Sequence, residues 1–286
     1  MRTEQEVLEL VMSFASGDPR VRALTLHGSR VNPTVKKDIF QDYDICFIVN
    51  DLESFKLDPN WVDLFGERLI MQCPEDMNLD DSNIQKDQNT LTYLMLFKDF
   101  NRIDLKLILI DDMDLHLDSL TRVLLDKDKI VKNRTDPSDI DYRIKPPTQK
   151  EFSDCCNEFW WVSTYVSKGL IRDELIYSIA ILNGPMRDML FRTINWVIGH
   201  ENNYTVNIGN YNRYIKNHVS PELWTQIGST YPILERNSIK SAQNNLMTIF
   251  DQQSRVIAEF NNFALTDSDK IAALTYRDYV SASMQR

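Results

Sequence analysis

Two carboxylates two residues apart, Asp42 and Asp44, lie at the start of an apolar segment, residues 43–50, that reads Tyr-Asp-Ile-Cys-Phe-Ile-Val-Asn. A run this rich in β-branched and aromatic residues predicts a buried strand. Side chains two apart on a strand point to the same face, so the two carboxylates should project together. Because adjacent carboxylates repel each other unless a cation lies between them, the chain is expected to fold so that this strand end can bind a cation.

A third carboxylate, Asp104, lies in a second strand-like segment, residues 102–110. If the two strands pair side by side, Asp42, Asp44 and Asp104 form a three-carboxylate site, and hard oxygen ligands of this kind suit Mg²⁺. Two such ions about 3.5–4 Å apart can stabilise the attacking and leaving oxygens of a phosphoryl displacement. Asp104 could instead act as a general base, or form only a salt bridge with Arg102 or Lys106.

A Gly-Ser-Arg turn, Gly28, Ser29 and Arg30, follows the strand pattern of residues 21–27. Gly28 allows the backbone to approach a ligand closely, and Ser29 offers an N–H and a hydroxyl group to an anion. Arg30 could neutralise phosphate charge, and a helix opening at Arg30 would add free N–H groups. A Gly-Ser pair alone carries little information. Combined with the strand-borne carboxylates, it predicts a site for a nucleoside triphosphate.

These motifs match a known family. Residues 28–30 followed by Asp-Tyr-Asp at 42–44 resemble the signature of the polymerase-β-like nucleotidyltransferases. The longer strings at 27–32, 40–45 and 159–166 resemble more narrowly the aminoglycoside 6-adenylyltransferases, also called streptomycin adenylyltransferases, along nearly the whole chain. This resemblance implies transfer of AMP from ATP to a streptomycin hydroxyl, at position 6, with release of pyrophosphate and resistance to the antibiotic. The motif chemistry alone indicates only nucleotidyl transfer.

An α+β architecture is expected, with a mixed-sheet nucleotidyltransferase domain at 1–145 and a helical, acceptor-binding domain at 146–286. The boundary is placed at Lys-Pro-Pro-Thr, residues 145–148, where two prolines interrupt regular structure and Thr148 can cap a helix. The substrate cleft is expected between the two domains. Strand patterns occur at 21–27, 43–50, 68–73, 91–98 and 102–110, and helical patterns at 3–16, 113–120, 149–168, 171–198, 220–227 and 238–264.

The net charge of −10 bears on the partner. It disfavours a polymerase or tailing enzyme, which needs a basic track for nucleic-acid phosphates. It favours a cationic small-molecule acceptor, although acidity also serves solubility. No segment has the length of a membrane span or the form of a signal peptide, and the four cysteines lack metal-site spacing. We therefore expect a cytoplasmic protein with reduced thiols, and neither nucleic acid nor membrane as partner.

Aromatic residues mark the first helix of the helical domain. Trp160, Trp161 and Tyr165 fall at helical spacing, with Trp161 and Tyr165 one turn apart. They could contact the acceptor or the adenine. A stripe of aromatic residues on a helix is, however, more often part of the core.

Charged residues near the end of the same helix have two interpretations each. Lys168 could reach the triphosphate, or could simply lie where a helix C-terminus favours positive charge. Asp173 and Glu174 could pair with guanidinium groups of the acceptor, or stabilise the start of the next helix.

Three alternative functions remain open from the sequence. The same chemistry could act on another small molecule or on a protein side chain. The chain could be a non-catalytic nucleotide-binding module, although such a module has no need to keep mutually repelling carboxylates. A polynucleotide-extending enzyme is the third, and it conflicts with the acidic charge.

Overall fold

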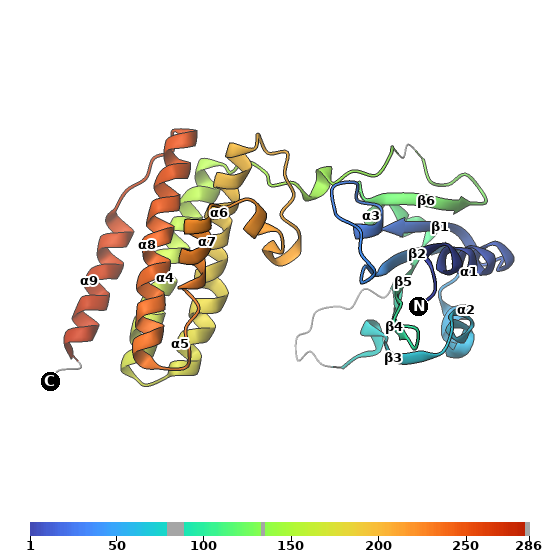
Figure 1. Cartoon of the computed structure of the whole chain (residues 1–286), viewed down its shortest axis with the longest axis horizontal. Coiled ribbons are helices and arrows are strands. Elements are labelled where there is room, and N and C mark those ends of the chain that lie inside the picture. The colour runs from blue at the N-terminus through green and yellow to red at the C-terminus, as the bar shows by residue number, and fades with distance from the viewer. Residues whose placement is uncertain (79–88, 133–134, 284–286) are drawn as a thin grey trace. The chain divides into compact units, whose positions relative to one another are not determined.

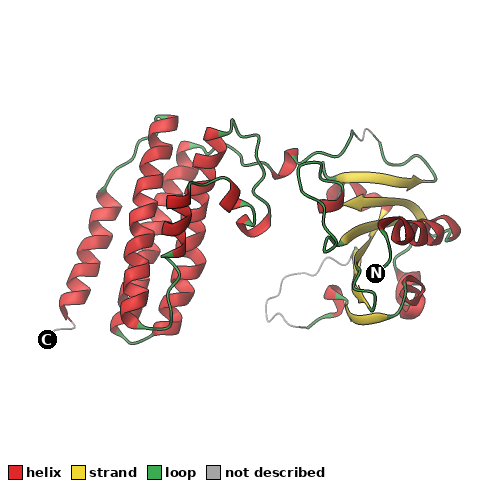
Figure 2. Cartoon of the chain, viewed as in Figure 1, coloured by secondary structure: helices red, strands yellow, loops and turns green. Residues whose placement is uncertain are grey.

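The computed structural model describes residues 1–78, 89–132 and 135–283. The chain forms two compact units, Met1–Asp141 and Tyr142–Arg286, which we call the sheet unit and the helical unit. All strands of the described residues belong to the sheet unit, and the helical unit contains only helices and loops (Figures 1 and 2). The α+β fold predicted from the sequence is therefore confirmed. Within the described residues, no helix is long and apolar enough to cross a membrane.

The sheet unit contains a six-stranded mixed sheet with the order β3-β4-β5-β2-β1-β6. Only β2 and β5 pair in parallel; the other neighbours are antiparallel. All five predicted strand segments form strands. The sixth, β6, was missed because it is a largely half-exposed edge strand flanked by charged residues. The strands are β1 Val21–His27, β2 Tyr43–Val49, β3 Arg68–Gln72, β4 Thr90–Phe97, β5 Arg102–Leu109 and β6 Thr121–Asp126.

The two faces of the sheet are covered unequally. On one face, odd-numbered residues of β2 such as Phe47 pack into a large core with the helix α1, Glu4–Gly17. On the other face, Cys46 and Ile48 join a much smaller apolar cluster beside α3, Met113–His116. Asp44 lies on this second face, before the smaller cluster begins. On this face, the end of β2 that carries Asp44 therefore lies outside the apolar cluster. The remaining short helix of this unit is α2, Glu53–Lys56.

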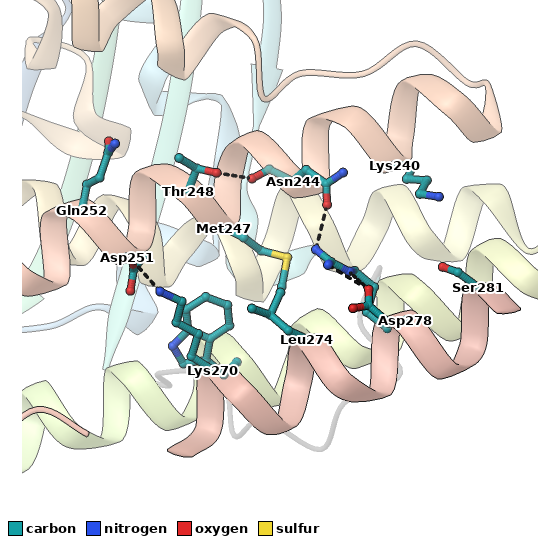
Figure 3. A pocket seen from close by; sticks show the side chains of 12 residues that line it. Lys240, Asn244, Met247, Thr248, Asp251, Gln252, Lys270, Leu274, Asp278 and Ser281 are labelled. Carbon is teal, nitrogen blue, oxygen red and sulfur yellow. Dashed lines mark hydrogen bonds and ion pairs between the residues drawn. The ribbon is translucent and has the colours of Figure 1, made fainter. Parts of the chain in front are cut away.

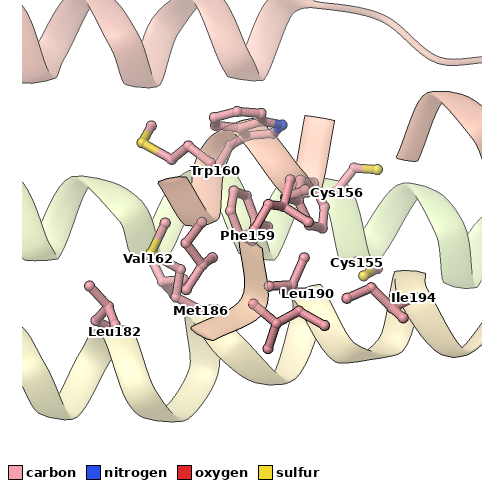
Figure 4. Packing of buried hydrophobic residues seen from close by; sticks show 14 of the residues in the cluster. Cys155, Cys156, Phe159, Trp160, Val162, Leu182, Met186, Leu190 and Ile194 are labelled. Atoms are coloured by element: carbon pink, nitrogen blue, oxygen red, sulfur yellow. The ribbon is translucent and has the colours of Figure 1, made fainter. Parts of the chain in front are cut away.

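The helical unit is built around α4, whose capping box joins Thr148 and Glu151 as the sequence predicts. Its core includes Phe159 and Trp160 of α4 (Figure 4). The Phe159 ring stacks on Phe250 with centroids 3.6 Å apart. The helices are α4 Gln149–Ile171, α5 Leu175–Ile181, α6 Arg187–Glu201, α7 Pro221–Gly228, α8 Arg236–Asn261 and α9 Ser268–Ser283.

Two features of the helical unit differ from the sequence-based expectation. The single helix predicted over 171–198 is interrupted by a π-helical segment, Leu182–Met186, which contains Pro185. Proline removes a backbone donor, and Gly184 takes a non-helical conformation there, so α5 and α6 are separate helices. The predicted helices also ended at 264, whereas the structure adds α9 after it.

Candidate active site

The three predicted carboxylates are brought to one end of the sheet by the pairing of β2 with β5. These strands are parallel and in register, with Asp44 directly opposite Asp104. Because directly paired residues project to the same face, the two carboxylates lie next to each other. Asp42 precedes β2 by one residue. The strand pairing that the three-carboxylate hypothesis required is present.

Asp44 carries the electrostatic cost of this arrangement. Burial, followed by the neighbouring carboxylates of Asp104 and Asp42, raises its pKa to about 6. An acid with so high a pKa is one that disfavours its own ionised form. Positive charge brought to this position would therefore be bound favourably.

Arg102, on the same face of β5, already supplies part of that positive charge. Its Nε and Nη2 atoms each donate a hydrogen bond of 2.7 Å to the Asp104 carboxylate, and Nη1 lies 3.7 Å from Asp42 Oδ2. The sequence-based alternative of a salt-bridged Asp104 is thus also present. Within the part of the chain that the structure describes, no three His, Cys, Asp or Glu side chains are arranged to hold a metal ion. Both carboxylate oxygens of Asp104 accept a hydrogen bond from Arg102.

The Gly-Ser turn lies against the same carboxylates. β1 pairs with β2 so that His27 faces Asp44, and the chain then turns at Gly28 with φ +69°. A Cβ atom on Gly28 would lie 2.3 Å from Asp44 Oδ2, well inside van der Waals contact. Only glycine fits here, since the position requires both the left-handed conformation and the space. The close approach predicted for Gly28 is therefore made to a carboxylate of the site.

The turn continues as one 3₁₀ turn, Gly28–Arg30, and not as the helix that the sequence suggested at Arg30. Val31, Pro33 and Thr34 follow in turn conformations, so no run of free helical N–H groups forms. Ser29 is half-buried, and its hydroxyl group makes no hydrogen bond to the other described residues. That hydroxyl is available to a ligand.

Arg30 is buried and has a positioning role. Its Nε donates to the Asp42 carbonyl at 3.0 Å and its Nη2 to the Gln41 carbonyl at 2.7 Å. Its Nη1 pairs with Glu4 at 3.1 Å, and the guanidinium lies 3.5 Å from the Tyr43 ring centroid. These contacts fix the backbone on which Asp42 is carried. The phosphate contact expected for Arg30 stays a prediction.

His27 lies directly before the Gly-Ser turn, and hydroxyl groups hold both nitrogens of its ring. Its Nε2 lies 2.7 Å from Thr25 Oγ1, and its Nδ1 lies 3.2 Å from Thr121 Oγ1. Because both ring nitrogens contact hydroxyl groups, the His27 side chain is fixed directly before Gly28. Its position directly before the Gly-Ser turn is the only sequence signal that could have indicated this role.

In the helical unit, the aromatic residues of α4 divide into core and surface. Trp160 is buried and packs edge-on against Phe159. Trp161 is 59% exposed and its Nε1 donates to the Tyr165 hydroxyl at 2.7 Å. The side chains of Trp160, Trp161, Tyr165 and Lys168 line one groove of about 530 Å³ beside α9.

The remaining predicted residues of the helical unit lie elsewhere. Lys168 places its ammonium group 5.1 Å from the centroid of the Tyr165 ring. Asp173 and Glu174 form the exposed turn between α4 and α5 and do not line that groove. Asp173 pairs with Arg236 at 2.7 Å. Lys168 thus lies beside the aromatic residues of the groove, whereas the two acids lie outside it.

Comparison with known proteins decides the family. The sequence matches the model of the family described as streptomycin adenylyltransferase over residues 1–280. The chain belongs to this family. It is 40% identical over 276 residues to the aminoglycoside 6-adenylyltransferase of Bacillus subtilis (strain 168), covering 94% of this chain and 95% of the relative. It is 42% identical over 260 residues to that of Campylobacter jejuni, covering 90% and 89%.

A solved structure of an aminoglycoside 6-adenyltransferase from Bacillus subtilis is also similar, with 35% identity, a TM-score of 0.49 and coverage of 98% of this chain and 99% of that one. Membership of the family confirms the resemblance read from the motifs and makes the chain an adenylyltransferase enzyme. Such an enzyme takes its adenylyl group from a nucleotide co-substrate.

Proposed function

We propose that the protein transfers AMP from ATP to the 6-hydroxyl group of streptomycin, releases pyrophosphate and so confers resistance. The single observation that carries the chemistry is the in-register placement of Asp44 and Asp104 on adjacent parallel strands, with Asp42 beside them. Family membership supports adenylyl transfer, and the relatives' names support an aminoglycoside acceptor.

Mg²⁺ fits the donor set of the sheet unit. Carboxylate oxygens are its preferred protein ligands, and the pKa of Asp44 is raised by burial and then by the two neighbouring carboxylates, whose charge a cation would offset. Asp42, Asp44 and Asp104 would hold it, once Arg102 releases Asp104. When bound, Mg²⁺ would offset the negative charge that builds up on the transferring and leaving phosphates.

The chain's own residues supply the remaining functions. The Ser29 hydroxyl and the amides of the Gly28–Arg30 turn bind the β- and γ-phosphates of ATP. Asp104 accepts the proton of the acceptor hydroxyl as its oxygen attacks the α-phosphorus. The bond between the α-phosphorus and the bridging oxygen then breaks, and pyrophosphate leaves with that oxygen. Arg30 and His27 act indirectly by fixing the backbone that carries Asp42 and Gly28.

We assign catalysis to residues 1–145 and acceptor binding to residues 146–286. The acidic charge of the protein attracts a cationic acceptor such as streptomycin, which carries guanidinium groups. Lys168 contributes to triphosphate binding in this scheme. The acceptor contacts expected from the sequence are Trp160, Trp161, Tyr165, Asp173 and Glu174.

Pyrophosphate release by the purified protein tests this proposal. With ATP and Mg²⁺, we expect release that depends on streptomycin. A panel of acceptors separates the alternatives. Release with another small molecule, or with a protein, but not with streptomycin would identify that compound as the acceptor. Magnesium-dependent ATP binding without release for any acceptor would support a non-catalytic module and contradict the proposal.

A further inference from the structure

Two cavities of the helical unit differ in whether their polar side chains already have hydrogen-bond or ion-pair partners. The cavity of about 540 Å³ between α8 and α9 contains charges that pair with one another (Figure 3). Lys270 binds Asp251 at 2.7 Å, while Arg277 binds Asp278 at 2.9 Å and Asn244 at 3.2 Å. These contacts hold α9 against α8, so this cavity has the character of a helix–helix contact.

A second cavity, of about 500 Å³, lies where the chain enters the helical unit. We call it the entry pocket. Its walls are the segment from Tyr142 to Pro147, the first turns of α4 and α6, and the loop 208–212. Asp188, Asn195, Tyr211 and Asn212 are among the residues that line it.

The loop of the entry pocket is held in a costly conformation. Tyr211 and Asn212 have φ values of +55° and +58°, in the left-handed region, and Gly209 precedes them at +70°. Glycine and asparagine tolerate this conformation, whereas Tyr211 pays about 1–3 kcal/mol for it. The Tyr211 side chain is fully exposed, so its burial does not offset the cost. Strain of this kind that packing does not explain is characteristic of ligand-binding positions.

The side-chain amide of Asn195 lies in the same pocket, and its oxygen lacks a hydrogen-bond donor in the described part of the chain. Its Nδ2 donates to Asn212 Oδ1 at 2.9 Å, which helps to hold the strained loop. Its Oδ1 is buried and accepts no hydrogen bond from any described residue. A buried acceptor without a donor costs about 1–3 kcal/mol. A ligand hydroxyl or ammonium group would supply the missing donor.

The charges of the entry pocket contrast with those between α8 and α9. Asp188, in the first turn of α6, makes no hydrogen bond or ion pair with other residues of the described chain. Glu151, by contrast, is engaged by the N–H and hydroxyl of Thr148. Lys145 and Arg192 also line the pocket, so a strongly cationic ligand must be recognised by local contacts, not by net charge. Asp188 is the carboxylate that remains available for such a contact.

We propose that the entry pocket binds one ring of the cationic, hydroxylated acceptor, an inference that rests on the proposed function. The ring stacks on Tyr211, where a guanidinium or ammonium group gains a cation–π contact. One of its hydroxyl or ammonium groups donates to Asn195 Oδ1, and a cationic substituent pairs with Asp188. The strained loop thus presents Tyr211 to the ligand. This site is distinct from the Trp161–Tyr165 groove.

Steady-state kinetics of the full chain, with streptomycin titration by calorimetry in the presence of a non-hydrolysable ATP analogue, tests the pocket. We expect Tyr211→Gly and Asp188→Asn each to weaken streptomycin binding and raise its KM about tenfold, with the KM for ATP unchanged. Tyr211→Phe should bind like the wild type. Because Tyr211→Gly also relieves the backbone strain, it should melt no lower than the wild type, which separates lost binding from lost folding.

Asp154→Asn is the matched control, since Asp154 is an exposed α4 acid whose one ion pair within the described residues is with Lys150. If the wild type adenylylates streptomycin while Tyr211→Gly and Asp188→Asn bind it normally, the pocket assignment is wrong and the proposed function stands. If the wild type neither binds nor modifies streptomycin, the acceptor assignment of the proposed function fails, and the pocket assignment fails with it.

Discussion

Replacing Asp44 with asparagine should stabilise the protein while abolishing its activity. The pKa of Asp44 is raised from 3.8 to about 6 by burial and by the neighbouring carboxylates, so its ionised form opposes folding. A shift of about two units corresponds to roughly 3 kcal/mol, at 1.36 kcal/mol per unit. Water screens part of this, and we expect a gain of about 1–2 kcal/mol. The isosteric amide keeps the contact with Gly28 but cannot serve as an anionic ligand.

The stability gained by Asp44→Asn should increase with pH. Below the unfolded pKa of 3.8, Asp44 is protonated in both states and contributes nothing to the difference between variant and wild type. As the pH rises through the folded pKa of about 6, the wild type loses stability relative to Asp44→Asn. The gain should therefore be full at pH 7.5 and nearly absent at pH 4.

Metal-free calorimetry at the two pH values, together with pyrophosphate release, is the assay. Asp99→Asn is the control of opposite sign, because Arg2 and Asn101 hold the pKa of Asp99 well below its usual range. Removing that charge should lower the melting temperature at pH 7.5. An Asp44→Asn protein that is less stable than the wild type at pH 7.5, or equally stabilised at both pH values, would refute the reasoning.

Three further predictions follow from the described contacts. Gly28→Ala should lower turnover about 100-fold, because the added Cβ displaces the Asp44 carboxylate; Gly17→Ala, with open space around its Cβ, should match the wild type in the same kinetic assay. Arg30→Gln should lower kcat at least tenfold and destabilise the sheet unit by about 2–3 kcal/mol, measured by urea unfolding, since buried carbonyls lose a charged donor; unchanged kcat would contradict the positioning role. Trp160→Ala should cost about 3–5 kcal/mol of stability, whereas Trp161→Ala should cost under about 1 kcal/mol, because only Trp160 is buried; equal losses on unfolding would contradict this division.

Local sequence patterns were sufficient to identify the main strands and the motif residues. The apolar, β-branched-rich run of residues 43–50 identified β2, and the Asp-x-Asp spacing predicted that Asp42 and Asp44 project together at its start. The requirement for glycine at position 28 could also be anticipated, although its contact is with Asp44. These features depend on neighbours within a few residues.

The features that the sequence left undecided depend on contacts between distant segments. The exact register that sets Asp104 opposite Asp44 is a pairing across some sixty residues, and no local pattern fixes it. The bidentate contact of Arg102 with Asp104 is local, since the two residues are two apart on β5, and it was one of the alternatives that the sequence offered. The helix break at Gly184 is an exception. Pro185, the next residue, was a local signal for a break that the single helix predicted over 171–198 did not take into account.

The mass of streptomycin after incubation with the protein, ATP and Mg²⁺ tests the central claim most directly. We predict a product heavier by one adenylyl group, attached at the 6-hydroxyl, and no such product with Asp44→Asn. Unmodified streptomycin after complete incubation with correctly folded wild-type protein would contradict the account.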